Sequence, residues 1–199
     1  DILNKPSISI STIENPIEYG MKRINQTEVK EDLGLNFVSG LRAVLKQDPD
    51  VVMVGSVEEK EVARLCVNAS LTSKLVLISI NTPTPAQSIA RMIDMGVDAF
   101  TLTTSLKVVI GHSLVKKLGQ DTEEHLLSEK EISKLHKFCD LDKVRERLIE
   151  EKVISKNTKW ENIKFLKPID LAGGGGAFTG DIGIHEVLRV TPSIKEIIL

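Results

Sequence analysis

One stretch, DPDVVMVGSVEE at residues 48 to 59, has the form with which nucleotide-hydrolysing proteins bring an acid to a magnesium-bound phosphate. A short apolar strand at residues 51 to 54 is entered from Asp50 and closed by Gly55. The position after the glycine, where an acid would stand, holds Ser56. A serine hydroxyl is not basic at neutral pH and cannot activate water as a carboxylate can. The sequence therefore predicts a strand of this form in which the position for the acid holds a serine.

Composition limits the classes of protein to consider. The chain has 199 residues, 41% of them hydrophobic and 4% aromatic, so aliphatic side chains must build the core. The net charge of -2 gives no support for a nucleic-acid partner or a charged membrane surface. No apolar run reaches the roughly 18 residues of a membrane span. Because the chain begins at Asp1 with no signal-like segment, we expect an intracellular protein, present as a fragment that has lost its start.

The two cysteines, Cys66 and Cys139, lie far apart and form no C-x-x-C pair. Cys66 sits in VARLCVNA, on the apolar stripe of a predicted helix. We expect two free thiols in a reducing compartment.

Strand and helix patterns alternate along the first half of the chain. Buried strands that are wholly apolar are typical of a parallel sheet covered on both faces. The alternation predicts an α/β fold with short links and right-handed crossovers. We expect strands at 7–13, 24–29, 51–54 and 75–80, and helices at 37–46 (capped by Asn36), 58–71, 83–96 (with Ile89, Met92 and Ile93 facing inward) and 99–111.

The pattern changes at Gly119, and it predicts three segments. Residues 1–118 form the α/β core, and residues 119–165 a charged helical insertion with helices at 128–136 and 141–152. Residues 166–199 return to the core with the strand IGIHEVLRV and a helix opened by Thr191-Pro192. The four glycines at 173–176 are typical of a turn. They do not indicate a phosphate loop, because no lysine-hydroxyl pair follows them.

Six segments resemble, in order, the ATPases of type II secretion and type IV pilus assembly: STIENPIEY, INQTEV, SGLRAVLKQDPDVVMVG, LTSKLVLISINT, ARMIDMGVDAF and GDIGIHEVLRVT. The resemblance implies a RecA-like P-loop ATPase core that works as a ring of six subunits. It implies that ATP and Mg²⁺ bind between subunits, and that hydrolysis drives pilin or pseudopilin assembly. The implied place is the cytoplasmic side of the inner membrane, in contact with platform proteins.

The sequence departs from this family where chemistry is done. No G-x-x-x-x-G-K-[ST] phosphate loop occurs in these 199 residues; in the family it would lie upstream of Asp1. The acidic box keeps Glu14 and Glu18, but Asn15 stands where the family usually has aspartate. The strand segment keeps Asp50, whereas Ser56 stands at the position of the glutamate that orients or deprotonates the attacking water.

Other family positions are also substituted. Lys74 and Asn81 stand where the family usually has two histidines, and neither can shuttle a proton at neutral pH as imidazole does. Lys74 could still contact a phosphate, although such a lysine is more often simply solvated. Arg42 is retained and could reach a neighbouring subunit's phosphate, while its partner position holds Lys46, a weaker clamp than arginine.

The resemblance also implies two C-x-x-C pairs that bind zinc in many members of the family. Here those positions hold Gly119, Thr122, Asp170 and Gly173, so we expect no zinc. The histidines at 125, 136 and 185 form no spaced pair in the sequence.

Three hypotheses remain from the sequence. The first is an active motor subunit, in which another acid replaces the one missing at Ser56. Glu58 and Glu59 are poor substitutes, because they begin a predicted helix, where acids suit the dipole. The second is a scaffold that keeps the fold without turnover, and the third is a decayed fragment. Loss confined to polar chemical positions, with apolar positions intact, favours the scaffold over decay.

Overall fold

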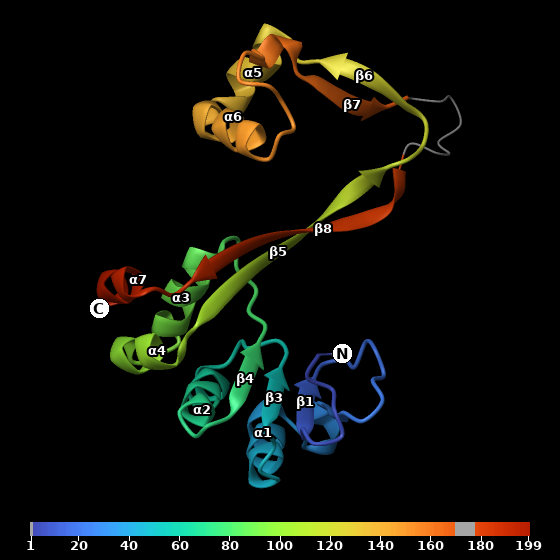
Figure 1. Ribbon diagram of the computed structural model, residues 1–199. Helices are drawn as coiled ribbons and strands as arrows, with labels where there is room; N and C mark the ends of the chain where they lie inside the picture. The colour runs from blue at the N-terminus through green and yellow to red at the C-terminus, as the bar shows by residue number, and fades with distance from the viewer. Residues whose placement is uncertain (1, 170–177) are drawn as a thin grey trace. The chain divides into compact units, whose positions relative to one another are not determined.

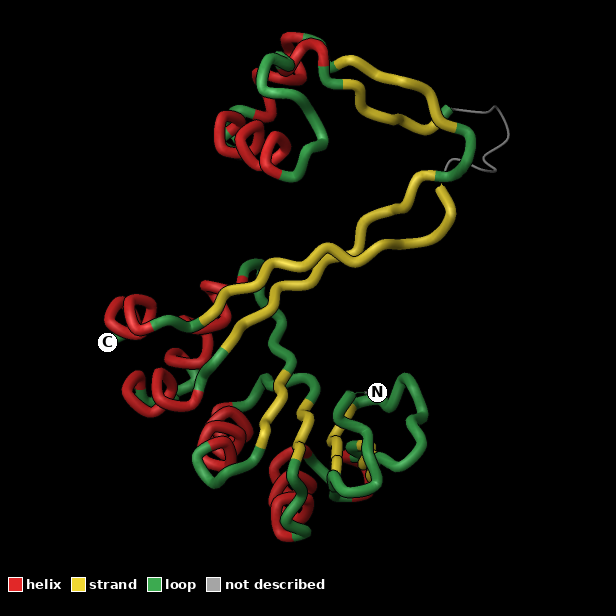
Figure 2. The backbone as a smooth tube through the Cα atoms, viewed as in Figure 1, coloured by secondary structure: helices red, strands yellow, loops and turns green. Residues whose placement is uncertain are grey.

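The computed structural model describes residues 2–169 and 178–199 (Figures 1 and 2). The chain divides into two compact units, each considered by itself. The core unit comprises Asp1–His112 and His185–Leu199, and the insert unit comprises Ser113–Ile184. The division into 1–118, 119–165 and 166–199 stays a prediction.

A four-stranded parallel sheet organises the core unit. Its order is β2-β1-β3-β4, and register pairs such as Ser11–Val52 and Val52–Val76 place alternate side chains on common faces. This confirms the predicted α/β fold with a mostly parallel sheet. The strands are β1 (Ile10–Glu14), β2 (Asn25–Glu28), β3 (Val51–Val54) and β4 (Leu75–Ile78).

Helices α1 (Phe37–Lys46) and α2 (Lys60–Ser70) cover one face of this sheet. Asn36 caps α1 as predicted: its side chain accepts a hydrogen bond from Ser39 N at 2.8 Å. The helix lies so close to the sheet that a Cβ on Gly40 would come 2.4 Å from Ile13 Cδ1. The shared core contains Ile13, Val52, Val54, Leu41, Val44, Val62, Ala63 and Cys66.

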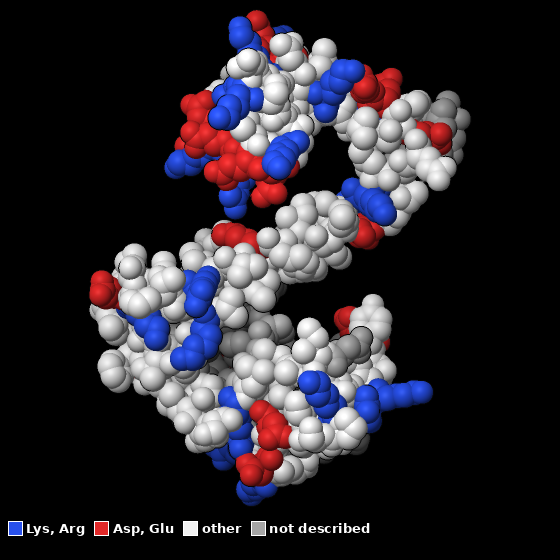
Figure 3. Space-filling view, in the orientation of Figure 1, with Lys and Arg blue, Asp and Glu red and all other residues white. Residues whose placement is uncertain are grey.

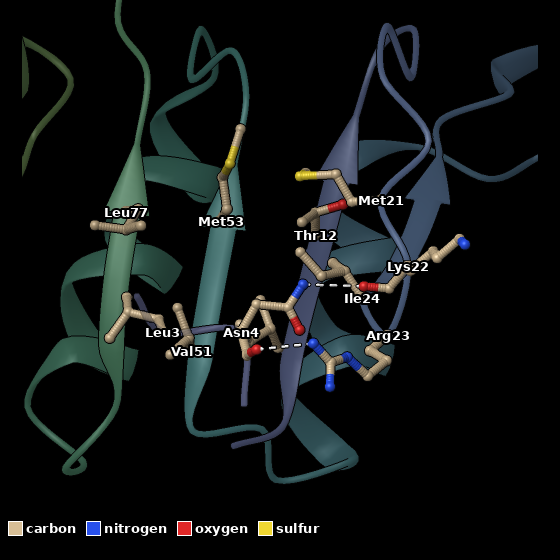
Figure 4. Close-up of a pocket in the computed structure, with 11 residues that line it drawn as sticks. Leu3, Asn4, Thr12, Met21, Lys22, Arg23, Ile24, Val51, Met53 and Leu77 are labelled. Atoms are coloured by element: carbon tan, nitrogen blue, oxygen red, sulfur yellow. Dashed lines mark hydrogen bonds between the residues drawn. The ribbon is translucent and has the colours of Figure 1, made fainter. Parts of the chain in front are cut away.

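The opposite face of the sheet carries a cavity of about 410 Å³ (Figure 4). Thr12, Val51, Met53 and Leu77 line its floor, and Met21 to Ile24 line its rim. These floor residues alternate along their strands with the residues that α1 and α2 bury. On this face Thr12 and Val51 are buried while Leu77 of β4 is exposed, so the predicted cover of both faces holds for β1 and β3 and fails at β4.

The rest of the core unit extends the same apolar core. Helix α3 (Pro85–Asp94) is capped by Thr84 and buries Ile89 and Met92. It begins two residues later than the sequence predicted, and Ile93 is 37% exposed rather than facing inward. The remaining elements are η1 (Glu31–Leu33), α4 (Ala99–Ser105) and α7 (Pro192–Ile198), with α7 capped by Thr191 as predicted.

The helix predicted for residues 99–111 is wrong beyond its first half. Helix α4 ends at Ser105, Leu106 is extended, and β5 (Val108–Leu118) begins almost at once. The run Val108-Val109-Ile110 explains the change, because β-branched side chains lose rotamer freedom in helices and pack well in strands. Strand β5 pairs with β8 (Phe178–Arg189), which contains the predicted IGIHEVLRV strand.

The insert unit contains the two predicted helices and a strand pair that the sequence analysis missed. Helix α5 (Glu129–Leu135) has the predicted capping box at Ser128, and Asp140 caps α6 (Leu141–Glu150). Strands β6 and β7 pair antiparallel beside them. Their charged positions, such as Glu124 and Lys164 at 2.8 Å, hid the strand pattern. Basic and acidic side chains cover much of the visible face of this unit (Figure 3). The added elements are β6 (Thr122–Leu126), η2 (Trp160–Asn162) and β7 (Lys164–Pro168).

The two free cysteines differ in environment, which gives a first prediction. Cys66 lies on the buried face of α2, and burial raises the pKa of its thiol to about 12, whereas Cys139 is exposed. Since the thiolate is the reactive form, we expect one fast and one slow equivalent of thiol labelling at pH 8. Peptide mapping after brief alkylation should find the label on Cys139. Equal labelling of both would contradict the packing of α2.

The capping box of α5 gives a second prediction. Hydrogen bonds donated by Ser128 Oγ (2.7 Å) and Ser128 N (2.8 Å) lower the pKa of Glu131 from 4.5 to about 2, with His125 Nε2 contributing at 3.0 Å. A lowered pKa means that the carboxylate stabilises the fold fully above pH 4.5 and loses that effect as pH falls through 2. NMR titration of the Glu131 carboxyl carbon should give a midpoint near 2. A midpoint near 4.5 would show that the capping box does not form.

Candidate functional site

Five of the eight residues singled out in the sequence lie at or beyond the carboxyl ends of the parallel strands. Glu14 ends β1, Asn15 and Glu18 follow it, Ser56 follows β3, and Asn81 follows β4. In open α/β sheets, ligands bind outside the carboxyl ends of the strands. We refer to this region as the carboxyl edge.

Glu14 is held in place by two side chains from neighbouring positions. Its Oε1 accepts hydrogen bonds from Thr12 Oγ1 at 2.5 Å and from Gln26 Nε2 at 3.0 Å. Gln26 also donates to Tyr19 O at 2.9 Å and accepts from Met21 N at 2.6 Å. One glutamine therefore fixes both the Glu14 carboxylate and the loop after β1 that contains Glu18.

The backbone around Ser56 is fixed against the end of β4. Ser79 N donates to Val54 O at 3.0 Å, and Val57 N donates to Ser79 O at 2.8 Å. A Cβ on Gly55 would stand 3.0 Å from Ser79 Oγ, so glycine permits this close approach. Gly55 N also donates to Ile13 O at 3.1 Å. Ser56 thus occupies a defined, half-buried position between the ends of β1 and β4.

Two of the candidate residues lie at the opposite, amino edge of the sheet. Asp50 Oδ2 accepts from Ser9 N at 2.7 Å, and Asp50 O accepts from Leu75 N at 3.0 Å. Lys74 forms a close ion pair with Asp48, and this contact lowers the pKa of Asp48. At about 3.3 Å per residue, the extended segment from Asp50 to Ser56 separates them by roughly 20 Å. Asp50 and Lys74 therefore organise the strand starts, away from the carboxyl edge.

Arg42 lies on neither edge. It projects from α1, is largely exposed, and pairs with Glu61 of α2 at 2.5 Å. Within this chain its guanidinium faces the outer surface of the helical layer. The structure therefore does not bring it to Glu14 or Ser56.

A hollow of about 430 Å³ opens beside the ends of β1 and β2. Asn15, Glu28, Glu31 and Asp32 line it, together with Lys30. Lys30 Nζ lies 3.0 Å from Glu28 Oε2, and their hydrogen bond lowers the pKa of Glu28. Acids outnumber the single lysine here, so the hollow favours a cation over a phosphate.

The four positions at which the resemblance implied zinc-binding cysteines in the family are only partly described. Thr122 lies in β6 and Gly119 just before it, whereas Asp170, Gly173 and the glycine run at 173–176 lie outside the described residues. Within residues 2–169 and 178–199, no three His, Cys, Asp or Glu side chains converge as a metal cage. In the same ranges, no helix has the length and apolar character needed to cross a bilayer.

Sequence motifs missed the residues that hold Glu14. Thr12 lies two positions before Glu14 and so on the same face of β1, and Gln26 is the register partner of Thr12 on β2. The period-two rule could have found Thr12. Gln26 required the pairing of β1 with β2, which sequence spacing does not give.

The whole chain, residues 1–199, matches the family model described as type II/IV secretion system protein. This chain belongs to that family. The match also confirms the resemblance that the six segments indicated.

Two curated relatives show what this family member is similar to. It is 34% identical, over its full length, to the type IV pilus assembly ATPase PilB of Pseudomonas aeruginosa, and covers 32% of that protein. It is 35% identical over 196 residues to the type II secretion system ATPase E of Vibrio cholerae, covering 98% of this chain and 35% of the relative. The chain thus spans about a third of the length of these relatives.

Solved structures show the same fold. The pilus retraction motor PilT with bound ADP superposes with a TM-score of 0.61 at 24% identity, over 99% of this chain and 43% of that one. The Legionella pneumophila ATPase DotB gives a TM-score of 0.57 at 15% identity, over 98% and 41%. These likenesses establish the fold, that of the RecA-like P-loop ATPases.

Proposed function

We propose that this secretion-family chain supplies part of an ATPase site of a type II secretion or type IV pilus motor, and that hydrolysis at this site is impaired. Ser56 carries the proposal. It stands on a fixed backbone at the centre of the carboxyl edge, between the ends of β1 and β4. A hydroxyl there can accept or donate a hydrogen bond, but it cannot take a proton from water at neutral pH.

The residues of the carboxyl edge suit a magnesium ion better than they suit the phosphates of a nucleotide. The Glu14 carboxylate and the Ser56 hydroxyl offer hard oxygen ligands of the kind Mg²⁺ takes through one or two protein groups. A bound Mg²⁺ would neutralise charge developing on the phosphates. The 199 residues contain no phosphate loop with its lysine, so binding of the triphosphate requires groups from elsewhere.

Glu14 is a poor replacement for the missing base. Its Oε1 already accepts hydrogen bonds from Thr12 and Gln26, so this oxygen is engaged within the chain rather than free to take a proton from water. Glu58 and Glu59 precede α2, with Glu59 at its N-cap and neither in its first turn. Both acids are exposed, and both lie beyond Val57, which is tied to Ser79. These placements favour a site that binds nucleotide over a site that hydrolyses it.

A non-catalytic scaffold is the second candidate, and the intact core favours it. The residues that pack α1 and α2 on the sheet remain apolar, while substitutions gather at polar positions. In either role we propose a subunit of a six-membered ring at the cytoplasmic side of the inner membrane, beside platform proteins. Arg42, facing outward from α1, is available to a neighbouring subunit only if its pair with Glu61 opens.

The experiment uses the longest polypeptide that the coding sequence provides. Its mass in solution is measured with and without Mg·ATP, and phosphate release is followed under the same conditions. We expect a ring that forms with nucleotide while phosphate release stays at background. A monomer under both conditions would contradict the ring, and clear turnover would contradict impairment.

A further inference from the structure

The imidazoles of His112 and His185 meet on the β5–β8 ribbon, although 72 positions separate them in the sequence numbering. Their ring centroids lie 4.9 Å apart, with the ring planes inclined by 35°. Both residues belong to the core unit, and both are exposed. The spacing of the histidines in the sequence did not predict this contact.

The two histidines face each other directly across the ribbon. Val190 N donates to Lys107 O at 3.0 Å, and a Cβ on Gly111 would stand 3.6 Å from Glu186 Cβ. Residue numbers thus rise on one strand as they fall on the other, which is an antiparallel register that places His112 opposite His185. Hydrogen-bonded and non-hydrogen-bonded pairs alternate along such strands.

Lys107 and Val190 form a hydrogen-bonded pair. Because the two kinds of pair alternate from there, His112 and His185 form a non-hydrogen-bonded pair. In these pairs the Cα atoms are about 4.5 Å apart and the side chains are closest. Two histidines whose Cα atoms are this close can both direct a ring nitrogen at one bound atom. Their register therefore favours chelation over two independent surface histidines.

We propose that His112 and His185 form a two-imidazole binding site for a transition-metal dication such as Zn²⁺. Zn–N bonds of about 2.0–2.1 Å at a tetrahedral angle place two ring centroids about 5 Å apart, close to the observed separation. Neutral imidazole suits zinc, copper and nickel, while Mg²⁺ and Ca²⁺ prefer oxygen. Water completes the coordination, because the two rings are exposed.

The surroundings of the pair do not oppose a cation. Side chains on one face of a strand recur every second residue. The neighbours on the same face within the core unit are Ile110 and Val187, which carry no charge. Glu186 lies on the other face, opposite Gly111. A bound metal would cross-link β5 to β8 next to the point where the chain enters the insert unit.

The test is a zinc titration of the tag-free full chain, monitored by calorimetry and by NMR of the histidine rings. We expect one saturable equivalent of Zn²⁺ and joint shifts of the His112 and His185 ring signals. His112→Gln or His185→Gln should each weaken binding by about tenfold or more, since the second ligand of a chelate binds intramolecularly. His125→Gln and His136→Gln are matched controls that should bind as the parent does.

Each result decides the proposal. Loss of binding in both ribbon variants, with Mg²⁺ unable to compete, supports the site. Unchanged affinity in His112→Gln and His185→Gln overturns it, as does loss in His125→Gln or His136→Gln. Absence of saturable binding to the parent chain also overturns it. The ring signals of the parent report binding directly, so a variant that fails to fold does not decide the outcome.

Discussion

Ser56→Glu is expected to raise ATP turnover by about 10²–10⁴-fold in the longest polypeptide that the coding sequence provides, the range that a positioned general base contributes. The backbone at Ser56 is already fixed by the bonds of Val54 and Val57 to Ser79, so a new carboxylate would start from a defined point. Phosphate release under saturating Mg·ATP measures the gain.

Ser56→Gln is the matched control for this gain. Glutamine has the size and hydrogen-bonding reach of glutamate but does not accept a proton at neutral pH. We expect Ser56→Gln to stay at background. If both variants stay at background, the missing acid is not the defect that limits turnover. If both rise equally, the gain comes from side-chain size and the general-base explanation is contradicted.

Leu41→Ala is expected to lower the free energy of unfolding of the core unit by about 2–5 kcal/mol, the usual cost of emptying a fully buried leucine site. Leu41 is 0% exposed and packs within the core that joins α1 to the sheet. Alkylation of the buried Cys66 as a function of urea reports opening of this unit.

A control variant and a second probe separate this effect from a general loss of stability. Leu33→Ala makes the same chemical change at a site that is 76% exposed, and should change stability by no more than about 0.5 kcal/mol. The fluorescence of Trp160, the single tryptophan, reports the insert unit. Equal shifts of the Cys66 midpoint in both variants would contradict the packing of α1.

Local signals predicted the elements that have strong local causes. The Asn36 cap placed the start of α1, and the apolar run 51–54 gave β3 with its bounds. The boundary after α4 was wrong because Leu102 to Ile110 is apolar at both helical and strand spacing, and pairing of β5 with β8 decides it. Strands β6 and β7 were missed because cross-strand ion pairs replace the apolar alternation.

The candidate site was predicted in part. Glu14 ends a strand, Ser56 follows one and Asp50 precedes one, so position alone already separated Asp50 from the other two. Grouping them by family motif obscured that difference. The contacts of Gln26 and the facing pair His112 and His185 depend on strand register. Register depends on how the buried faces of two strands align with each other, which the pattern of one strand alone does not contain.

The identity of the nucleotide bound after a single encounter shows whether the site with Ser56 hydrolyses ATP. The longest polypeptide, in excess over radiolabelled ATP with Mg²⁺, is quenched after a time long enough for an active motor to turn over many times. We expect the bound nucleotide to remain ATP in the parent protein and to become ADP in Ser56→Glu. Bound ADP in the parent protein would show that this edge hydrolyses ATP with a serine at position 56, and would contradict the account.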